Sequence, residues 1–263
     1  MKTSHHFRTL FLSDIHLGYK DCKAEYLLDL LDHCQADQVY LVGDIIDLYA
    51  LKRKSHWPES HGKVLDKLFK IANSQTQVFY IPGNHDASLR DYTTHEFAQV
   101  TLLLDHIHET ADGRRFFVFH CDILDPQVCM SRWYAVLGDK LYDLIQFLNR
   151  WCNHSRRLFG YRYWSLSGYI KSKVAKAGEA MHRYKVAAVH EAKKRNLDGV
   201  ICGHIHHPEI DQIDDLIYCN DGDWVENCTA LVEDFDGQLS LLHWTEEQAT
   251  VISLPHTSKS HVA

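Results

Sequence analysis

The stretch TLFLSDIH, residues 9–16, places an apolar run directly before two side chains that can bind a metal ion, Asp14 and His16. Short apolar runs bounded by turn residues are typical of buried β-strands. A strand that ends in a metal ligand delivers this ligand to the rim of its sheet, where several rims can converge on one site. The stretch therefore predicts a buried strand and a metal site at the end of that strand.

Four further blocks repeat this arrangement along the chain, and almost every one follows an apolar run. They are Gly43-Asp44, Gly83-Asn84-His85-Asp86, His120 and Gly203-His204-Ile205-His206. The blocks supply seven candidate ligands with oxygen or nitrogen atoms and no thiolate. Such a set suits two Mn²⁺ or Fe²⁺ ions better than a structural zinc ion. We therefore expect a dinuclear site, with Mn²⁺ favoured and Fe²⁺ or a mixed pair as alternatives. The candidate ligands are Asp14, His16, Asp44, Asn84, His120, His204 and His206.

Each block taken alone also has a purely structural interpretation. Asp14 could cap a helix, and Asp44 could be a turn residue after Gly43. His120 could be a hydrogen-bonded core histidine, and an isolated H-x-H pair is as typical of a surface as of a metal site. The ordered occurrence of all five blocks at strand ends favours the metal-site interpretation.

Composition limits the class of protein. The chain has 263 residues, of which 45% are hydrophobic and 24% charged, enough for one large domain with an elaboration. It contains no apolar run of the roughly 18 residues that a membrane helix needs, and its first residues do not resemble a signal peptide. Eight cysteines without a C-x-x-C pair argue against a zinc ribbon or a disulfide scaffold. We therefore expect a cytoplasmic protein with reduced cysteines.

Strand–helix–strand alternation early in the chain is followed by strand-rich sequence. This order predicts an α/β fold, a four-layer α/β/β/α sandwich of two mixed sheets. The expected helices are Lys23–Cys34 and His61–Asn73. The expected strands are Thr9–Leu12, Gln38–Val42, Gln77–Ile81, Phe116–Phe119, Gly199–Cys202, Leu216–Cys219, Cys228–Glu233 and Gln238–His243.

Residues 126–195 contain no metal-binding block and are expected to form a helical cap insertion. Within residues 150–195, twelve Lys or Arg and two Glu give a charge of +10, so a total of −7 leaves −17 for the rest. A helical hairpin with packed aromatic side chains and solvated charges is one interpretation. The charge asymmetry favours instead contact with a phosphorylated, partly apolar substrate or an anionic membrane surface. Nucleic-acid binding is a further option that the acidic remainder disfavours.

The five blocks, in this order, resemble the signature of the calcineurin-like metallophosphoesterases, and the resemblance extends from about Leu10 to about Trp244. It implies a single metallophosphoesterase domain over residues 1–263 that hydrolyses phosphoric ester or pyrophosphate bonds. In this resemblance Asp44 bridges the two ions. Asp14, His16 and His206 complete the first ion's ligands, and Asn84, His120 and His204 those of the second.

The resemblance also implies roles for residues that do not bind metal. It places His85 beside the leaving group as a proton donor or charge stabiliser, oriented by the carboxylate of Asp47. Asp86 and Asp122 are expected to fix the loops around the site.

Within the superfamily, chain length, strand order, the insert and Gly222-Asp223-Trp224 most resemble the UDP-2,3-diacylglucosamine diphosphatases of lipid A synthesis. This implies a lipid-linked nucleotide sugar as substrate, UMP and an acylated sugar 1-phosphate as products, and peripheral contact with the inner membrane face. The chain departs from that group at His85 and Asp47, where the group has Arg and Glu, and at Cys121, where it has Gly. The segment at residues 125–128 also differs from the acidic segment of that group.

Two alternatives to this substrate remain. The first is a phosphodiesterase or phosphatase that acts on another phosphoglycolipid, a nucleotide or a nucleic acid. The second is a non-catalytic scaffold of the same fold, which the presence of every ligand and of His85 disfavours. No partner protein is evident from the sequence.

Overall fold

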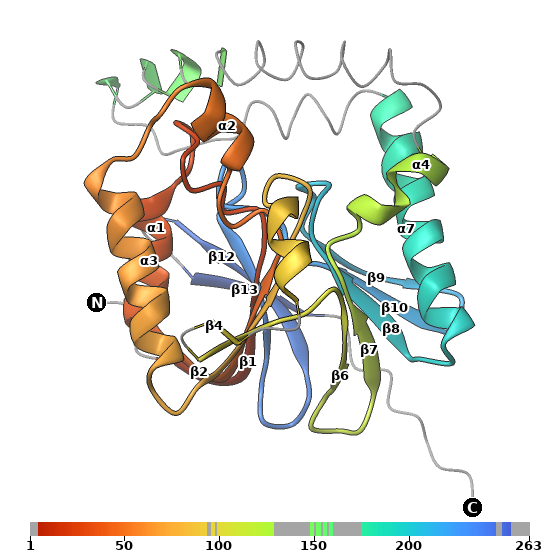
Figure 1. Ribbon diagram of the computed structural model, residues 1–263. Helices are drawn as coiled ribbons and strands as arrows, with labels where there is room; N and C mark the ends of the chain where they lie inside the picture. The colour runs from red at the N-terminus through yellow and green to blue at the C-terminus, as the bar shows by residue number, and fades with distance from the viewer. Residues whose placement is uncertain are drawn as a thin grey trace, which may run out of the picture.

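Two mixed β-sheets lie face to face at the centre of the molecule, and helices cover the outer face of each sheet (Figure 1). The computed structural model describes residues 5–93, 96–97, 99–128, 148–149, 151–153, 155–156, 158–159, 175–245 and 249–253. The layers follow the order helix, sheet, sheet, helix, which confirms the predicted α/β sandwich.

Parallel strands occupy the middle of each sheet. In the described chain, the first sheet has the order β13 (Ala249–Ser253), β12 (Leu239–Trp244), β11 (Thr229–Glu233), β1 (His5–Leu12), β2 (Cys34–Val42), β3 (Gln77–Ile81), β5 (Val100–Leu102) and β4 (Glu96–Phe97). The second has the order β6 (His106–Glu109), β7 (Arg115–Val118), β8 (Gly199–Cys202), β10 (Leu216–Asn220) and β9 (Glu209–Ile213). Strands β1, β2 and β3 run parallel, as do β7, β8 and β10. Their carboxyl ends therefore supply the loops from which a shared site can be built.

Three apolar layers hold the sandwich together. Between the sheets, Phe11 and Tyr40 share one cluster with Phe116 and Ile201. Leu27 of α1 (Ala24–His33) and Val64 of α3 (Glu59–Ala72) belong to the cluster on the outer face of the first sheet. The helices α7 (Ala175–Lys194) and α4 (Asp125–Val128) cover the second sheet. The short helix α2 (Leu48–Arg53) and the 3₁₀ segments η1 (Ala87–Tyr92) and η2 (Asp122–Leu124) follow strand ends.

All eight predicted strands and both predicted helices are present, with ends that differ by a few residues. Cys34 was expected in the first helix but is the first residue of β2, where it pairs with His5. Strands β4, β5, β6, β9 and β13 were not predicted. Four of these five lie at the edges of the sheets, and the fifth has three residues. Short edge strands lack the continuous apolar run by which a buried strand is recognised.

Only the two ends of the predicted cap insertion can be compared fully with the structure. Helices α4 and α7 are helical as expected, whereas residues 129–147 and 160–174 lie outside the described residues. The insertion as a whole stays a prediction. Within the described part of the chain, no helix is both long and apolar enough to cross a membrane.

A buried carboxylate, that of Glu233 in β11, connects the two sheets at the end away from the five blocks. It accepts hydrogen bonds from Arg8 Nη1 at 2.7 and 2.8 Å and from Thr9 Oγ1 at 2.6 Å, both in the first sheet. From the second sheet, His108 Nε2 lies 2.8 Å away, and the Ala111 backbone N–H donates at 2.8 Å. Although burial raises the pKa of Glu233, the hydrogen bonds from His108 and Thr9 bring it below its ordinary value of 4.5.

We expect Glu233→Ala to lower the free energy of unfolding by about 3 kcal/mol, because removing one partner of a buried ion pair leaves the others unpaired. The lowered pKa also sets a pH dependence. The stability that Glu233 contributes is present above pH 4.5 and is lost as the pH falls through the pKa of the folded state. Urea unfolding at pH 7 and pH 4 checks both effects. Glu233→Gln, which cannot titrate, should lose less stability between these pH values than the wild type, and an equal loss would contradict this account.

Candidate dinuclear metal centre

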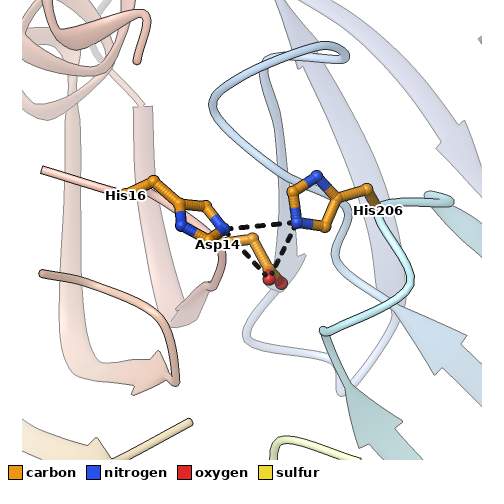
Figure 2. Close-up of side chains that lie close together, drawn as sticks. All are labelled: Asp14, His16 and His206. Carbon is orange, nitrogen blue, oxygen red and sulfur yellow. Dashed lines mark hydrogen bonds and ion pairs between the residues drawn. The ribbon is translucent and has the colours of Figure 1, made fainter. Parts of the chain in front are cut away.

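The first group of candidate ligands comes from the end of β1 and the loop after β8. Asp14 Oδ1 lies 3.1 Å from His206 Nε2 and 3.7 Å from His16 Nε2, and the two Nε2 atoms are 3.3 Å apart (Figure 2). Asp14 is fully buried, and no hydrogen bond within the described chain is directed at its Oδ1. One carboxylate oxygen and two imidazole nitrogens thus converge on a single point from both sheets.

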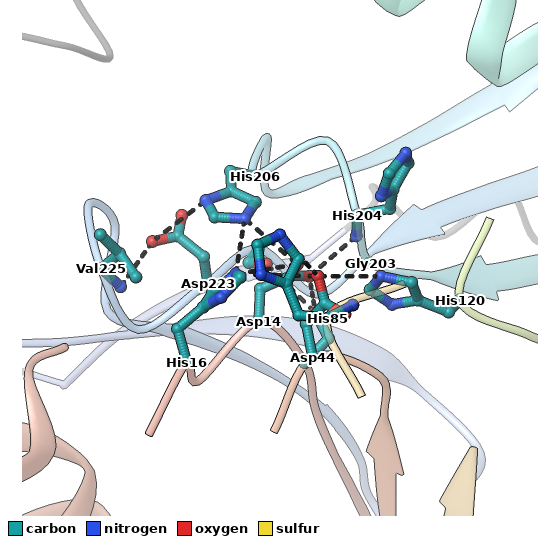
Figure 3. Close-up of polar contacts among 12 residues, drawn as sticks. Asp14, His16, Asp44, His85, His120, Gly203, His204, His206, Asp223 and Val225 are labelled. Atoms are coloured by element: carbon teal, nitrogen blue, oxygen red, sulfur yellow. Dashed lines mark hydrogen bonds and ion pairs between the residues drawn. The ribbon is translucent and has the colours of Figure 1, made fainter. Parts of the chain in front are cut away.

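The second group lies around Asp44, at the end of β2. Asp44 Oδ2 is 3.4 Å from His120 Nε2 and 3.8 Å from His16 Nε2, so it lies between the two groups. His120 Nδ1 is 2.8 Å from the carbonyl oxygen of Val42 and donates to it, so Nε2 is the nitrogen that could bind a metal ion. The Oδ1 atom of Asn84 is buried without a partner among the described residues, as is His120 Nε2. Figure 3 shows the rings of His16, His85, His120 and His206 around these carboxylates.

The backbone at these positions is unusual. Asp14, His16, Asp44, His204 and His206 all have positive φ angles, between 49° and 73°. Residues other than glycine seldom adopt this conformation, and it is concentrated at functional sites. The backbone N–H of His16 donates to Asp44 O at 2.8 Å, and that of Asp14 donates to Gly43 O at 3.0 Å. The loops that carry the candidate ligands therefore hold one another in place.

Glycines of the blocks leave room for ligands from other blocks. A Cβ atom on Gly83 would lie 2.3 Å from Asp44 Oδ1 and 2.6 Å from His120 Nε2. A Cβ on Gly203 would lie 2.5 Å from Asp14 Oδ2, and one on Gly43 would lie 2.1 Å from His120 Nδ1. The sequence predicted no role for these glycines. In the structure, they allow the backbone of one block to approach the side chains of another.

His85 lies at the exposed side of the site, with 31% of its side chain accessible. Its Nδ1 is 2.9 Å from Asp47 Oδ1, and Asp47 Oδ2 is 3.1 Å from His16 Nδ1. Asp47 also caps α2, since its Oδ1 accepts from the Ala50 N–H at 2.7 Å. The structure thus places Asp47 beside His85, as the resemblance implied, and adds a link to His16 that the sequence did not reveal. Tyr49, two residues further on, meets His85 edge to face at 5.4 Å between ring centroids.

His204 differs from the other candidate ligands. Its backbone N–H donates to Asp14 Oδ2 at 2.8 Å, but its ring lies outside the groups around Asp14 and Asp44. The ring packs against His120 with 5.2 Å between centroids, and its Nε2 lies 2.8 Å from Asp125 Oδ1. Sequence reasoning did not select Asp125, and its only signal is an acidic residue a few positions after His120.

Two further carboxylates fix the surrounding loops. Asp86 is fully buried and accepts hydrogen bonds from the backbone of Gly83 at 2.6 Å and Ile45 at 2.9 Å and from the Tyr80 hydroxyl at 2.5 Å. Asp122 accepts from Arg90 Nη2 at 2.7 and 2.8 Å, and Arg90 also donates to the carbonyl of Pro82. Both carboxylates therefore have the loop-fixing contacts that were expected of them.

A buried carboxyl group that the sequence analysis missed supports Asp14. Ser13 Oγ lies 2.6 Å from both Asp14 Oδ2 and Asp221 Oδ1. Asp221 is fully buried, and burial raises its pKa well above 3.8. No metal-binding block contains Asp221, so only its place beside Gly222-Asp223-Trp224 could have drawn attention to it.

Opposite charges dominate the electrostatics of the site. Burial by itself lowers the pKa of His16, but hydrogen bonds with Asp14 and Asp47 raise it to about 10. Burial also opposes a charge on His120, yet Asp44 and Asp14 raise the pKa of this imidazole well above 6.5. Although burial raises the pKa of Asp44, His120 and His16 bring it below its ordinary value. The carboxylates therefore attract positive charge, which bound cations can supply in place of protons.

The residues present fit two divalent cations. Buried polar atoms without a hydrogen bond are costly, and within the described chain Asp14 Oδ1, Asn84 Oδ1 and His120 Nε2 lack one. All three are ligand atoms of the kind that Mn²⁺, Fe²⁺ and Zn²⁺ accept.

The chain is similar to proteins that are already known. A curated protein, UDP-2,3-diacylglucosamine hydrolase of Porphyromonas gingivalis (strain ATCC BAA-308 / W83), is 25% identical over 228 residues, which cover 74% of this chain and 82% of that protein. Solved structures of similar fold include YfcE, a phosphoesterase from E. coli, with a TM-score of 0.48, 16% identity and coverage of 94% of this chain and 99% of its own. Vacuolar Protein Sorting 29 from Cryptosporidium parvum has a TM-score of 0.48 at 10% identity, with 93% and 94% covered.

A family model described as calcineurin-like phosphoesterase matches residues 7–208, which include all five blocks. The chain therefore belongs to the calcineurin-like phosphoesterase family and is a phosphoester hydrolase.

Proposed function

We propose that this phosphoester hydrolase works with two divalent metal ions. Mn²⁺ is the favoured metal, and Fe²⁺ or a mixed pair are alternatives. Asp14, His16 and His206 would hold one ion, and Asn84, His120 and His204 the other. The observation that carries the proposal is the position of Asp44 Oδ2, 3.8 Å from His16 Nε2 and 3.4 Å from His120 Nε2. A carboxylate between two cations reduces their mutual repulsion, which is strong at such separations.

When bound, the two ions polarise phosphoryl oxygens and make water nucleophilic near neutral pH. The chain's own residues then have distinct tasks. Asn84 contributes a neutral oxygen, so that the ligands do not cancel the positive charge that attracts the phosphate. His85, half-exposed at the edge of the site, donates a proton to the leaving oxygen, and Asp47 at 2.9 Å holds its ring.

We infer further that the substrate contains a pyrophosphate in a lipid-linked nucleotide sugar of the UDP-2,3-diacylglucosamine type. UMP and an acylated sugar 1-phosphate would be the products. The curated relative of that name and the basic, aromatic character of residues 150–195 support this inference. Such a substrate requires peripheral contact with the anionic inner membrane face, toward which a basic segment is attracted.

In the structure, the contacts of Gly222-Asp223-Trp224 stabilise the site. They give no direct information about the substrate. The backbone N–H of Trp224 donates to Asp14 O at 3.1 Å, and the Trp224 side chain is fully buried. Asp223 accepts from the backbone of Val225 at 2.7 Å and caps the turn. These contacts stabilise the loop that carries Asp14.

The second candidate function is that of a phosphodiesterase that acts on another substrate. The observation that favours it is the His85–Asp47 pair, which stands where the lipid A group has Arg and Glu. An alkoxide leaving group takes up a proton as it departs. A protonated imidazole can donate that proton, whereas a guanidinium keeps its own.

We expect Asp44→Ala to lose both metal ions and all hydrolysis, because it removes the carboxylate that lies between the two groups of ligands. His85→Ala should keep both ions and lose about 10²- to 10⁴-fold in rate, the usual contribution of a general acid. Metal analysis of the purified proteins and hydrolysis of bis-p-nitrophenyl phosphate measure the two effects. Asp236→Ala, a change in an exposed turn, is the control. Full activity in either site variant would reject the assignment.

The substrate class is tested with UDP-2,3-diacylglucosamine and the Mn²⁺-loaded protein, with bis-p-nitrophenyl phosphate as a generic diester and chelated protein as control. We expect rapid, metal-dependent release of UMP. Cleavage of the generic diester alone would reject the lipid-linked substrate and favour the second candidate. No cleavage of either compound would count against the dinuclear mechanism.

A further inference from the structure

The ring of His204 is held by two residues that have no assigned role. Its Nε2 lies 2.8 Å from Asp125 Oδ1, and the same carboxylate oxygen accepts a short hydrogen bond from the Tyr184 hydroxyl. The Tyr184 ring also packs against the His204 ring, with 5.6 Å between centroids at an interplanar angle of 70°. Tyr184, Asp125 and His204 thus form a chain of contacts that ends at a candidate metal ligand.

This chain of contacts starts on the two helices at the ends of the predicted cap insertion, residues 126–195. Asp125 is the first residue of α4, directly before the insertion, and Tyr184 lies in the middle of α7, at the other end of the insertion. Both helices belong to the apolar cluster that covers the second sheet, through Val128, Tyr184 and Ala188. The position of the His204 ring therefore depends on how α4 and α7 pack together.

The contact with Asp125 determines which nitrogen of His204 can bind a metal. An ionised carboxylate accepts a hydrogen bond from the imidazole, so Nε2 carries the hydrogen and Nδ1 has the free electron pair. His16 and His120 have the opposite arrangement, because Asp47 and the Val42 carbonyl hold Nδ1 and leave Nε2 free. Without Asp125, the His204 ring could present either nitrogen and rotate more freely.

We propose that Asp125, supported by Tyr184, is a positioning residue that fixes the His204 ring with Nδ1 available to the second metal ion. The inference rests on the proposed dinuclear function and extends it. It makes occupancy of the second site depend on the helices at either end of the cap insertion. The first ion, held by Asp14, His16 and His206, does not share this dependence.

The test is Mn²⁺ binding by calorimetry to the metal-free, full-length protein, together with electron paramagnetic resonance of the Mn²⁺-loaded protein. For the wild type, we expect two ions and the spectrum of a coupled pair. Asp125→Ala should bind the second ion about 10- to 100-fold more weakly, the usual effect of losing such a partner of a metal ligand, with the first ion unchanged. Asp125→Asn, whose amide oxygen can still accept the Nε2 hydrogen, should recover much of this affinity, and Tyr184→Phe should show a smaller loss than Asp125→Ala.

Asp211→Ala is the matched control, because Asp211 also binds α7, through Lys185 at 3.1 Å, but does not contact His204. It should bind both ions as the wild type does. Unchanged binding of both ions by Asp125→Ala would overturn the inference and leave the dinuclear function intact, as would equal weakening in Asp211→Ala. If Asp125→Ala does not fold, the other two variants decide. Wild-type affinity together with an unchanged coupled spectrum in both Asp125→Asn and Tyr184→Phe would overturn the inference. A wild-type protein that binds fewer than two ions would reject the proposed function itself.

Discussion

The burial of two carboxylates close together, those of Asp14 and Asp44, is the constraint on which the rest of the site depends. Atoms of these two residues and of His120 lie within 4.8 Å of one another, and both carboxylates are almost inaccessible to solvent. Buried like charges are unfavourable unless positive charge compensates them. The histidines that surround the carboxylates provide this compensation as protonated rings or as ligands of cations.

The same constraint accounts for the backbone of the loops. Several side chains can reach one buried point only if their loops approach closely, and Gly43, Gly83 and Gly203 permit that approach. Five of the seven candidate ligands have positive φ angles, a strained conformation for residues other than glycine. Such strain persists because the surrounding structure fixes it, here through backbone hydrogen bonds between loops and through the buried carboxylate of Asp86.

The sequence predicted the parts of this molecule that depend on local pattern. Apolar runs before Asp14, Asn84 and Gly203 identify β1, β3 and β8, since a buried strand needs such a run. Contacts between residues far apart in the chain could not be predicted in this way. Asp125 and His204 are separated by 79 residues, and His108 and Glu233 by 125. In both cases the chemical reason for the residue is a partner far away in the chain, which becomes visible only in the folded structure.

The two sheets contribute different candidate ligands, and this has a consequence for synthesis of the chain. Asp14, His16, Asp44 and Asn84 follow strands of the first sheet, whereas His120, His204 and His206 follow strands of the second. During synthesis, the candidate ligands of the first sheet therefore emerge from the ribosome more than a hundred residues before His204 and His206. Until residue 206 has emerged, the nascent chain carries carboxylates without their full set of partners. Under the proposed function, the full set of ligands for the two ions therefore comes together only after the second sheet has packed against the first.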